Sequence, residues 1–183
     1  MKGGDAQFVT LGIDREVFAV PVENVIEILD MRPMFRLPEA PPYLAGLIDV
    51  RGRAVPVIDL RTKLGLPAAA ATESTRILVL DVPMAGRNLV LGLVADRVFE
   101  VAAIAIDQIE PPPEIGIAWH SDYIRGTSRR NDSFVVIFDL PRLFSAAEVA
   151  YLGVEAALGG TSPATSAMTA AAPAADRGAV SGG

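Results

Sequence analysis

The sequence contains no cysteine, and His120 is the only histidine among its 183 residues. Without cysteine the chain can form no disulfide, thiolate zinc site or iron–sulfur cluster, and it has no thiol nucleophile. With one imidazole it cannot build a two-histidine metal site, and a serine triad would have a single candidate base. These absences argue against most hydrolytic chemistry, and we expect no bound metal or other cofactor.

Basic residues are also few. The 16 lysines and arginines stand against 22 acidic residues, which gives a net charge of −6. The bases are scattered, and Arg129-Arg130 is the longest basic run. Proteins that bind nucleic acid usually carry a basic patch that releases counterions from the phosphates. We therefore expect no nucleic-acid partner.

Long apolar runs are missing as well. No stretch of the sequence reaches the roughly 20 apolar residues that are needed to span a bilayer. The segment Met1–Asp5 is not followed by the apolar core of a signal peptide. We expect a soluble, cytoplasmic protein with no direct insertion into the membrane.

The two ends of the chain differ from its body. Residues 159–183 are rich in Ala, Gly, Ser, Thr and Pro and contain no aromatic residue, so they offer little apolar surface to offset the chain entropy lost on folding. We expect this tail to be disordered, either as a tether or as a passive extension, and residues 1–6 to be flexible. Before the tail, Ser145 and Glu148 have the spacing of a capping box, which predicts a helix over 145–158.

The body, from residue 7 to 144, consists of short apolar runs separated by Gly, Pro or Asp. Such runs are typical of a β-rich fold and favour small barrels. Neighbouring runs predict three hairpins, at 8–20, 45–58 and 76–95, and a further strand at 134–138. Four apolar residues spaced i, i+3, i+4 and i+7 behind Pro21 predict a short amphipathic helix: Val22, Val25, Ile26 and Leu29.

A weak internal repeat runs through the body. Tyr43–Gly46 stands 16 residues before Asp59-Leu60, and Tyr123–Gly126 stands 16 residues before Asp139-Leu140. A conserved order of motifs with one preserved spacing is a stronger signal of duplication than either motif alone.

Earlier in each unit, Val25–Ile28 parallels Val98–Val101. The repeat therefore predicts two units, at about 7–66 and 75–144. Units of this size are near the lower limit for independent cores, so we expect them to share an interface. A groove between two such units is a usual place for a binding site.

Three residues could carry chemistry. Asp59 and Asp139 each end an apolar strand, where a carboxylate either caps the following turn or takes part in acid–base catalysis. Their equivalence in the repeat favours capping. His120 lies in a polar stretch without an obvious nucleophile and orienting acid, which favours a surface or packing role. An enzyme that uses Asp59, Asp139 or His120 is the alternative to a binding protein.

The segment Gly46–Arg61 resembles the chemotaxis coupling protein CheW family. That family has, at this spacing, a glycine, a short strand, an Asn-Leu-Arg-Gly turn and a Pro-Val-x-Asp-Leu strand end. Here the turn is Asp49-Val50-Arg51-Gly52 and the strand end is Pro56–Leu60. The resemblance extends from Phe8 to about Leu152 and defines a CheW-like domain at 7–158.

The resemblance implies a mainly β fold of two packed SH3-like, five-stranded β-barrels with short helices and a C-terminal helix. It also implies an adaptor, not an enzyme, that couples methyl-accepting chemoreceptors to the histidine kinase CheA inside membrane-associated receptor arrays. No kinase or receiver module accompanies the domain, which favours a stand-alone adaptor.

The resemblance places Arg51 at the receptor-contacting groove. Other family positions linked to receptor or kinase binding correspond to six residues of this chain: Val25, Glu27, Gly46, Gly92, Val98 and Val101. Sequence spacing alone favours a solvated position in a hairpin for Arg51. It likewise favours a position on the solvent side of the predicted helix for Glu27. Within the family pattern, Arg51 can pair with a carboxylate of a helical partner while Val25 and Val98 supply apolar contact.

Overall fold

The computed structural model describes the backbone of residues 3–84, 86–112 and 121–159. His120 and the predicted tail from residue 160 onward lie outside the described residues. Ten strands lie within them: β1 (Asp5–Ile13), β2 (Glu16–Pro21), β3 (Val25–Asp30), β4 (Leu44–Val50), β5 (Arg53–Asp59), β6 (Arg76–Met84), β7 (Arg87–Ala95), β8 (Arg97–Ala105), β9 (Ile124–Arg130) and β10 (Ser133–Phe138). The helical segments are η1 (Val22–Asn24), α1 (Leu60–Lys63), η2 (Ile106–Gln108), η3 (Ser121–Tyr123), η4 (Leu140–Arg142) and α2 (Ala146–Gly159).

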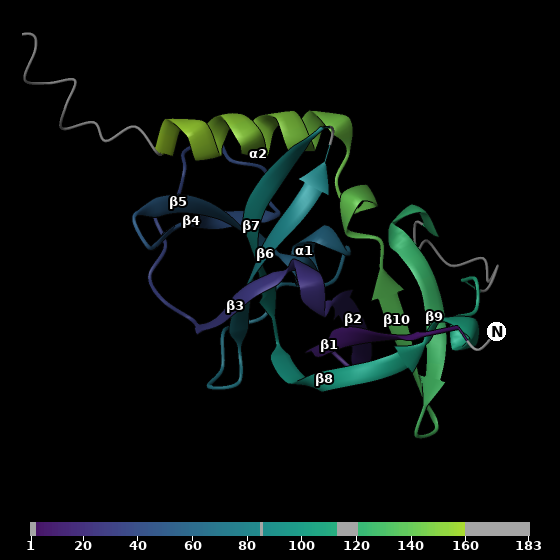
Figure 1. Cartoon of the computed structure of the whole chain (residues 1–183). Coiled ribbons are helices and arrows are strands. Elements are labelled where there is room, and N and C mark those ends of the chain that lie inside the picture. The colour runs from purple at the N-terminus through teal and green to yellow at the C-terminus, as the bar shows by residue number, and fades with distance from the viewer. Residues whose placement is uncertain (1–2, 85, 113–120, 160–183) are drawn as a thin grey trace, which may run out of the picture.

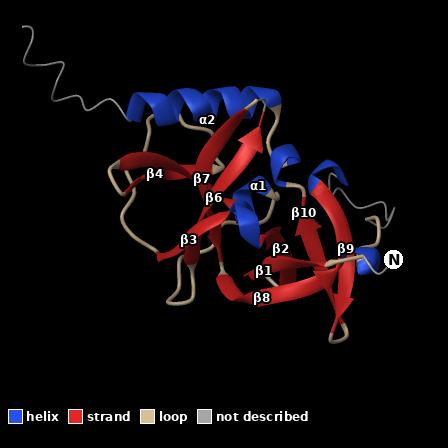
Figure 2. Ribbon diagram, viewed as in Figure 1, coloured by secondary structure: helices blue, strands red, loops and turns tan. Residues whose placement is uncertain are grey.

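The strands form two five-stranded sheets (Figures 1 and 2). The first has the order β8-β1-β2-β10-β9, and the second has the order β3-β6-β7-β5-β4. The three predicted hairpins are the antiparallel pairs β1–β2, β4–β5 and β6–β7. The fold is mainly β with two packed SH3-like barrels, as the sequence predicted; we refer to them as the first and the second barrel.

The two barrels repeat one plan. Each contains a hairpin whose first strand pairs antiparallel with an edge strand, β8 in the first barrel and β3 in the second. The second strand of each hairpin runs parallel to the next strand, β10 or β5, which pairs in turn with the other edge strand. The hairpin that begins each sequence unit lies in the sheet formed by the other unit. Hairpin β1–β2 pairs with β8 and β10, and hairpin β6–β7 pairs with β3 and β5. The boundary between 66 and 75 therefore does not separate the barrels.

The largest buried cluster lies between the two sheets and takes side chains from the hairpins of both. Phe18 and Phe138 stack within it, with ring centroids 4.8 Å apart. Each barrel also has a smaller core of its own, built on Phe8 in the first and Val57 in the second. The hairpin strands are therefore buried on both faces, which explains why Ile77–Leu80 is apolar at every position.

The amphipathic helix predicted from Val22 to Leu29 is wrong. Val22–Asn24 forms a single 3₁₀ turn, and the chain then continues as strand β3, antiparallel to β6. Half-buried and exposed side chains alternate along β3, which is the period of a strand. The β-branched Val25, Ile26 and Ile28 suit a pleated surface, and pairing with β6 outweighs the weak helical spacing.

The first strand begins earlier than the sequence suggested. Asp5 and Ala6, which we expected in a flexible terminus, lie opposite Ala105 and Ile104 of β8. Strand β1 is therefore nine residues long, and its first residues depend on a partner far along the chain.

Helix α2 begins at the predicted capping box. The Ser145 N–H donates to Glu148 Oε2 at 2.7 Å, and the Glu148 N–H donates to Ser145 Oγ at 3.2 Å. The helix buries Val149 and Leu152 against the shared core and lies along the second barrel (Figure 1). Among the described residues, no helix is long and apolar enough to cross a membrane.

Candidate functional site

The hairpin between β4 and β5 presents Arg51 to solvent. Arg51 and Gly52 form its two-residue turn with φ angles of 53° and 82°, which is the geometry of a type I′ turn. The Gly52 N–H donates to Asp49 Oδ1 at 2.7 Å. Asp49, which stands where the family usually has Asn, thus stabilises the turn through an acceptor oxygen that both residue types possess.

Arg51 reaches from this turn to the opposite edge of the second barrel. Its Nη2 atom donates to Glu27 Oε2 of β3 at 3.0 Å. The Arg51 side chain is 82% exposed and that of Glu27 is 22% exposed. Because β3 and β4 are the two edge strands of this sheet, the ion pair connects the two edges where the barrel closes. Glu27 therefore lies on an edge strand rather than on the predicted helix, and Arg51 has a partner.

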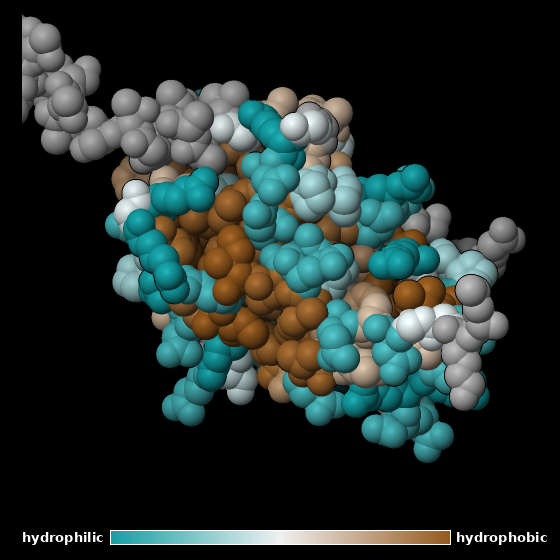
Figure 3. Space-filling model, in the orientation of Figure 1, coloured by the Kyte–Doolittle hydropathy of each residue, from teal (hydrophilic) through white to brown (hydrophobic). Residues whose placement is uncertain are grey.

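The strand that carries Glu27 also exposes apolar side chains. On β3, Ile26 is 52% exposed and Ile28 is 43% exposed, whereas Val25 is half-buried against the shared core. Figure 3 shows apolar side chains gathered over the face of the molecule that carries β3. Monomeric proteins rarely expose large contiguous apolar patches, and such patches usually mark interaction sites.

Strand β8 of the first barrel repeats this arrangement. Val98 is half-buried against the shared core, while Phe99 and Val101 are exposed. Between these two, Glu100 pairs with Arg130 at the end of β9, with Arg130 Nη2 3.0 Å from Glu100 Oε1. The expected site residues Val25, Glu27, Val98 and Val101 therefore all lie on the edge strands β3 and β8.

Gly46 and Gly92 are buried in the second barrel and present no side chain to a partner. A Cβ at Gly92 would lie 2.9 Å from Ile77 Cγ2, and one at Gly46 would lie 2.7 Å from the Phe35 carbonyl oxygen. Both distances are too short for normal packing. These two positions can influence a binding surface only through the shape of the barrel.

The two aspartates of the repeat differ in their contacts. Asp59 caps α1, since its Oδ1 accepts from the Arg61 N–H at 3.0 Å and its Oδ2 accepts from the Thr62 hydroxyl at 3.1 Å. The predicted cap at Asp139 is wrong, because its side chain accepts no hydrogen bond from η4. Pro141 occupies the second position of that turn and has no N–H to donate.

No catalytic arrangement joins these candidates in the described part of the chain. Both oxygens of Asp59 are occupied within its own turn. No group of three or more His, Asp or Glu residues lies together as a metal site among the described residues. His120 lies outside them.

A polar cluster joins the two barrels, and sequence reasoning missed it. The Arg61 guanidinium donates from Nε and Nη2 to the two oxygens of Asp96, at 3.0 and 2.8 Å. Asp96 Oδ2 also accepts from the N–H of Asp14, which lies in the β1–β2 turn of the first barrel, at 2.7 Å. Burial would raise the pKa of Asp96, but these hydrogen bonds and the charges of Arg61 and Arg97 hold it below its usual value.

Comparisons with known proteins agree on one family. The CheW-like domain family model matches residues 7–148. The probable chemotaxis protein CheW of Rhizobium etli is 31% identical over 148 residues, which cover 81% of this chain and 93% of that protein. The chemotaxis protein CheW of Helicobacter pylori is 33% identical, over 72% of this chain and 76% of that protein.

A solved structure has the same fold. The crystal structure of the scaffolding protein TtCheW from Thermoanaerobacter tengcongensis superimposes with a TM-score of 0.69 at 27% identity, covering 78% of this chain and 89% of that one. The family match spans both barrels, from within β1 into α2. The chain therefore belongs to the CheW-like domain family.

Proposed function

We propose that the protein is a chemotaxis adaptor that couples methyl-accepting chemoreceptors to the histidine kinase CheA in signalling arrays. Its relatives are chemotaxis proteins and a scaffolding protein by name. The observation that carries the proposal is the exposed Arg51, paired with Glu27 of a strand that also exposes the apolar side chains of Ile26 and Ile28. The protein acts by binding and carries out no reaction of its own.

The receptor side of the proposal rests on Arg51. Its backbone is held in the turn while its guanidinium stays largely exposed, so one end of the side chain is ordered and several N–H donors remain available. Ile26 and Ile28 lie on the adjoining edge strand. A receptor helix with a carboxylate next to apolar residues would suit this surface, because a charge-assisted hydrogen bond fixes its register and apolar contact supplies affinity.

The kinase side of the proposal rests on the second edge strand. Phe99 and Val101 of β8 form an exposed apolar surface, separated along the chain from the β4–β5 turn. Two surfaces on two barrels allow two partners to bind at once. The protein would then work in the cytoplasm and reach the membrane-associated arrays only through its partners.

The test is the substitution Arg51→Glu, with Arg53→Glu as the matched control in the same hairpin. Arg53 is also exposed and makes no ion pair with a described residue. Pull-down with a receptor fragment and with CheA should show receptor binding weakened about tenfold in Arg51→Glu. Kinase binding should be retained, as should both interactions in Arg53→Glu. A folded Arg51→Glu variant with unchanged receptor binding would contradict the proposal.

A further inference from the structure

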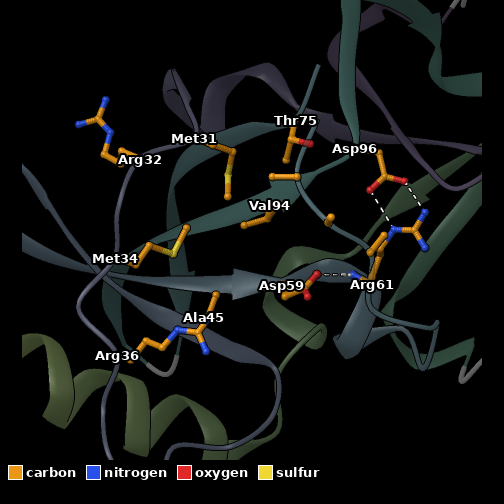
Figure 4. Close-up of a pocket in the computed structure, with 13 residues that line it drawn as sticks. Met31, Arg32, Met34, Arg36, Ala45, Asp59, Arg61, Thr75, Val94 and Asp96 are labelled. Atoms are coloured by element: carbon orange, nitrogen blue, oxygen red, sulfur yellow. Dashed lines mark hydrogen bonds and ion pairs between the residues drawn. The ribbon is translucent and has the colours of Figure 1, made fainter. Parts of the chain in front are cut away.

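A cavity of about 320 Å³ opens in the second barrel (Figure 4). It is lined by the connection between β3 and β4, the β5–α1 junction, the segment before β6 and the end of β7. None of the residues assigned to receptor or kinase binding lines it. Its size is at the lower end of cavities that hold small organic ligands.

One part of the cavity is apolar and adaptable. The side chains of Met31 and Met34 extend into it toward Val94, and Ala45 lies at its edge (Figure 4). Methionine side chains are flexible and polarisable, so they adjust to the shape of an apolar ligand. A purely hydrophilic ion would leave this part of the wall without a partner.

The acidic groups of the cavity are already occupied. Both oxygens of Asp59 accept hydrogen bonds within its own turn. Both oxygens of Asp96 accept from Arg61, whose remaining contacts are the Pro67 carbonyl and Asp14. The hydrogen-bonding atoms of these three side chains are therefore taken up within the protein, and Arg61 has little capacity to bind a ligand.

The charges that remain are positive. Arg32 and Arg36 also line the cavity, and neither makes a hydrogen bond or ion pair with any residue that the structure describes. Arg36 lies beside Ala45, whereas Arg32 extends outward from the rim (Figure 4). In a chain with a net charge of −6, two guanidinium groups without a carboxylate partner next to an apolar cavity favour an anion. The planar guanidinium matches a carboxylate in a bidentate geometry.

We propose that this cavity binds a carboxylate carried on a short apolar chain. Arg36 holds the carboxylate, Arg32 closes over it from the rim, and the apolar chain lies against Met31 and Met34. The ligand is either a free small carboxylate or an acidic side chain of a bound protein.

The experiment uses hexanoate as the probe and the methyl NMR signals of Met31 and Met34 as the readout. Hexylammonium, with the same chain and the opposite charge, and acetate, with the head group alone, are the controls. Hexanoate should shift both methyl signals saturably, and the controls should not. Equal shifts with hexylammonium, or no shift with hexanoate at tens of millimolar, would overturn the proposal.

The substitution Arg36→Gln tests the role assigned to the guanidinium. It should weaken hexanoate binding about tenfold, while Arg53→Gln, an exposed arginine of another segment, should leave it unchanged. Equal affinity in the wild type and Arg36→Gln would contradict the proposal. These readouts do not depend on the chemotaxis function.

The source of the carboxylate is distinguished by partner capture. If a bound protein supplies it, Arg36→Gln captures less receptor fragment or kinase, and hexanoate competes with that partner. If a free molecule supplies it, partner capture is the same in the variant and the wild type. Either result agrees with the proposed chemistry and identifies its source.

Discussion

Arg130 donates to Glu100 across the first barrel as Arg51 donates to Glu27 across the second, and both N–O distances are 3.0 Å. In each barrel the carboxylate lies on one edge strand, β8 or β3, and the guanidinium lies at the hairpin that contains the other edge strand. The two hairpin turns also agree, since Asn131 and Asp132 have positive φ angles like Arg51 and Gly52. An Arg–Glu pair therefore joins the two edge strands of each barrel, with Arg51 placed in the turn and Arg130 one position before it.

These two ion pairs should contribute little to stability. At least one partner of each pair is more than half exposed, and exposed ion pairs are typically worth less than about 1 kcal/mol. Glu27→Gln and Glu100→Gln should each change the free energy of unfolding, measured in urea, by no more than that. A much larger loss would mean that the pair holds the barrel closed, and binding defects of the variant could then not be assigned to the surface.

The cluster of Arg61 and Asp96 should matter more. Arg61 is 16% exposed and makes two charge-assisted hydrogen bonds to Asp96, which in turn accepts from the first barrel. Arg61→Ala should lower the free energy of unfolding by about 1.5–3 kcal/mol. Arg142→Ala, which removes an exposed arginine with only a long contact to Asp139, is the control. Equal effects of the two substitutions would show that the cluster does not stabilise the junction.

Acid should destabilise the protein through two carboxylates. Burial would raise the pKa values of Asp96 and Glu148, but hydrogen bonds and positive charges outweigh it, and both pKa values lie below their usual range. Their stabilising contribution is therefore complete above the unfolded-state pKa values, near 4, and is lost as the pH falls toward the folded-state values.

Urea unfolding of the wild type should accordingly show stability that decreases below about pH 4. The double variant Asp96→Asn, Glu148→Gln should show a shallower decrease over the same range, since it lacks the two groups. An identical pH dependence would mean that other carboxylates govern acid unfolding.

Gly92 should tolerate no side chain. An added Cβ would lie 2.9 Å from Ile77 Cγ2 and 3.3 Å from Val57 Cγ2, both on buried, branched side chains of neighbouring strands. Gly92→Ala should lower the free energy of unfolding by about 1–3 kcal/mol. Gly4→Ala, where a Cβ meets nothing within 4 Å, is the control and should be nearly neutral. An unchanged free energy of unfolding in Gly92→Ala would show that Ile77 and Val57 can move to accommodate the added methyl group.

Local features were predictable because their partners are close in the chain. The hairpins at 8–20, 45–58 and 76–95 each join two apolar runs through a short turn, so sequence spacing determines their pairing. The same holds for the capping box of Ser145 and Glu148 and for the cap at Asp59. The equivalent position Asp139 makes no such cap, because Pro141 in the following turn has no N–H to donate.

The candidate site was predictable only in part. The family resemblance indicates Arg51 and Glu27 separately, but the helical spacing around Glu27 hides their contact, which depends on Glu27 lying on an edge strand. The contact of Arg61 with Asp96 has no local signal, since 35 positions separate the two residues. Arginine–carboxylate pairs of this kind become visible only once the strands are placed.

The sequence by itself determined the β-rich class, the hairpins, the terminal helix and the family, because these depend on apolar periodicity, turn residues and short-range spacing. The tertiary structure decided that 25–30 is a strand, that each unit lends its first hairpin to the other barrel, and that Arg51 lies against Glu27. The physical reason is the same in each case. Pairing of strand edges and burial of both sheet faces in a shared core depend on partners far along the chain, which no local pattern specifies.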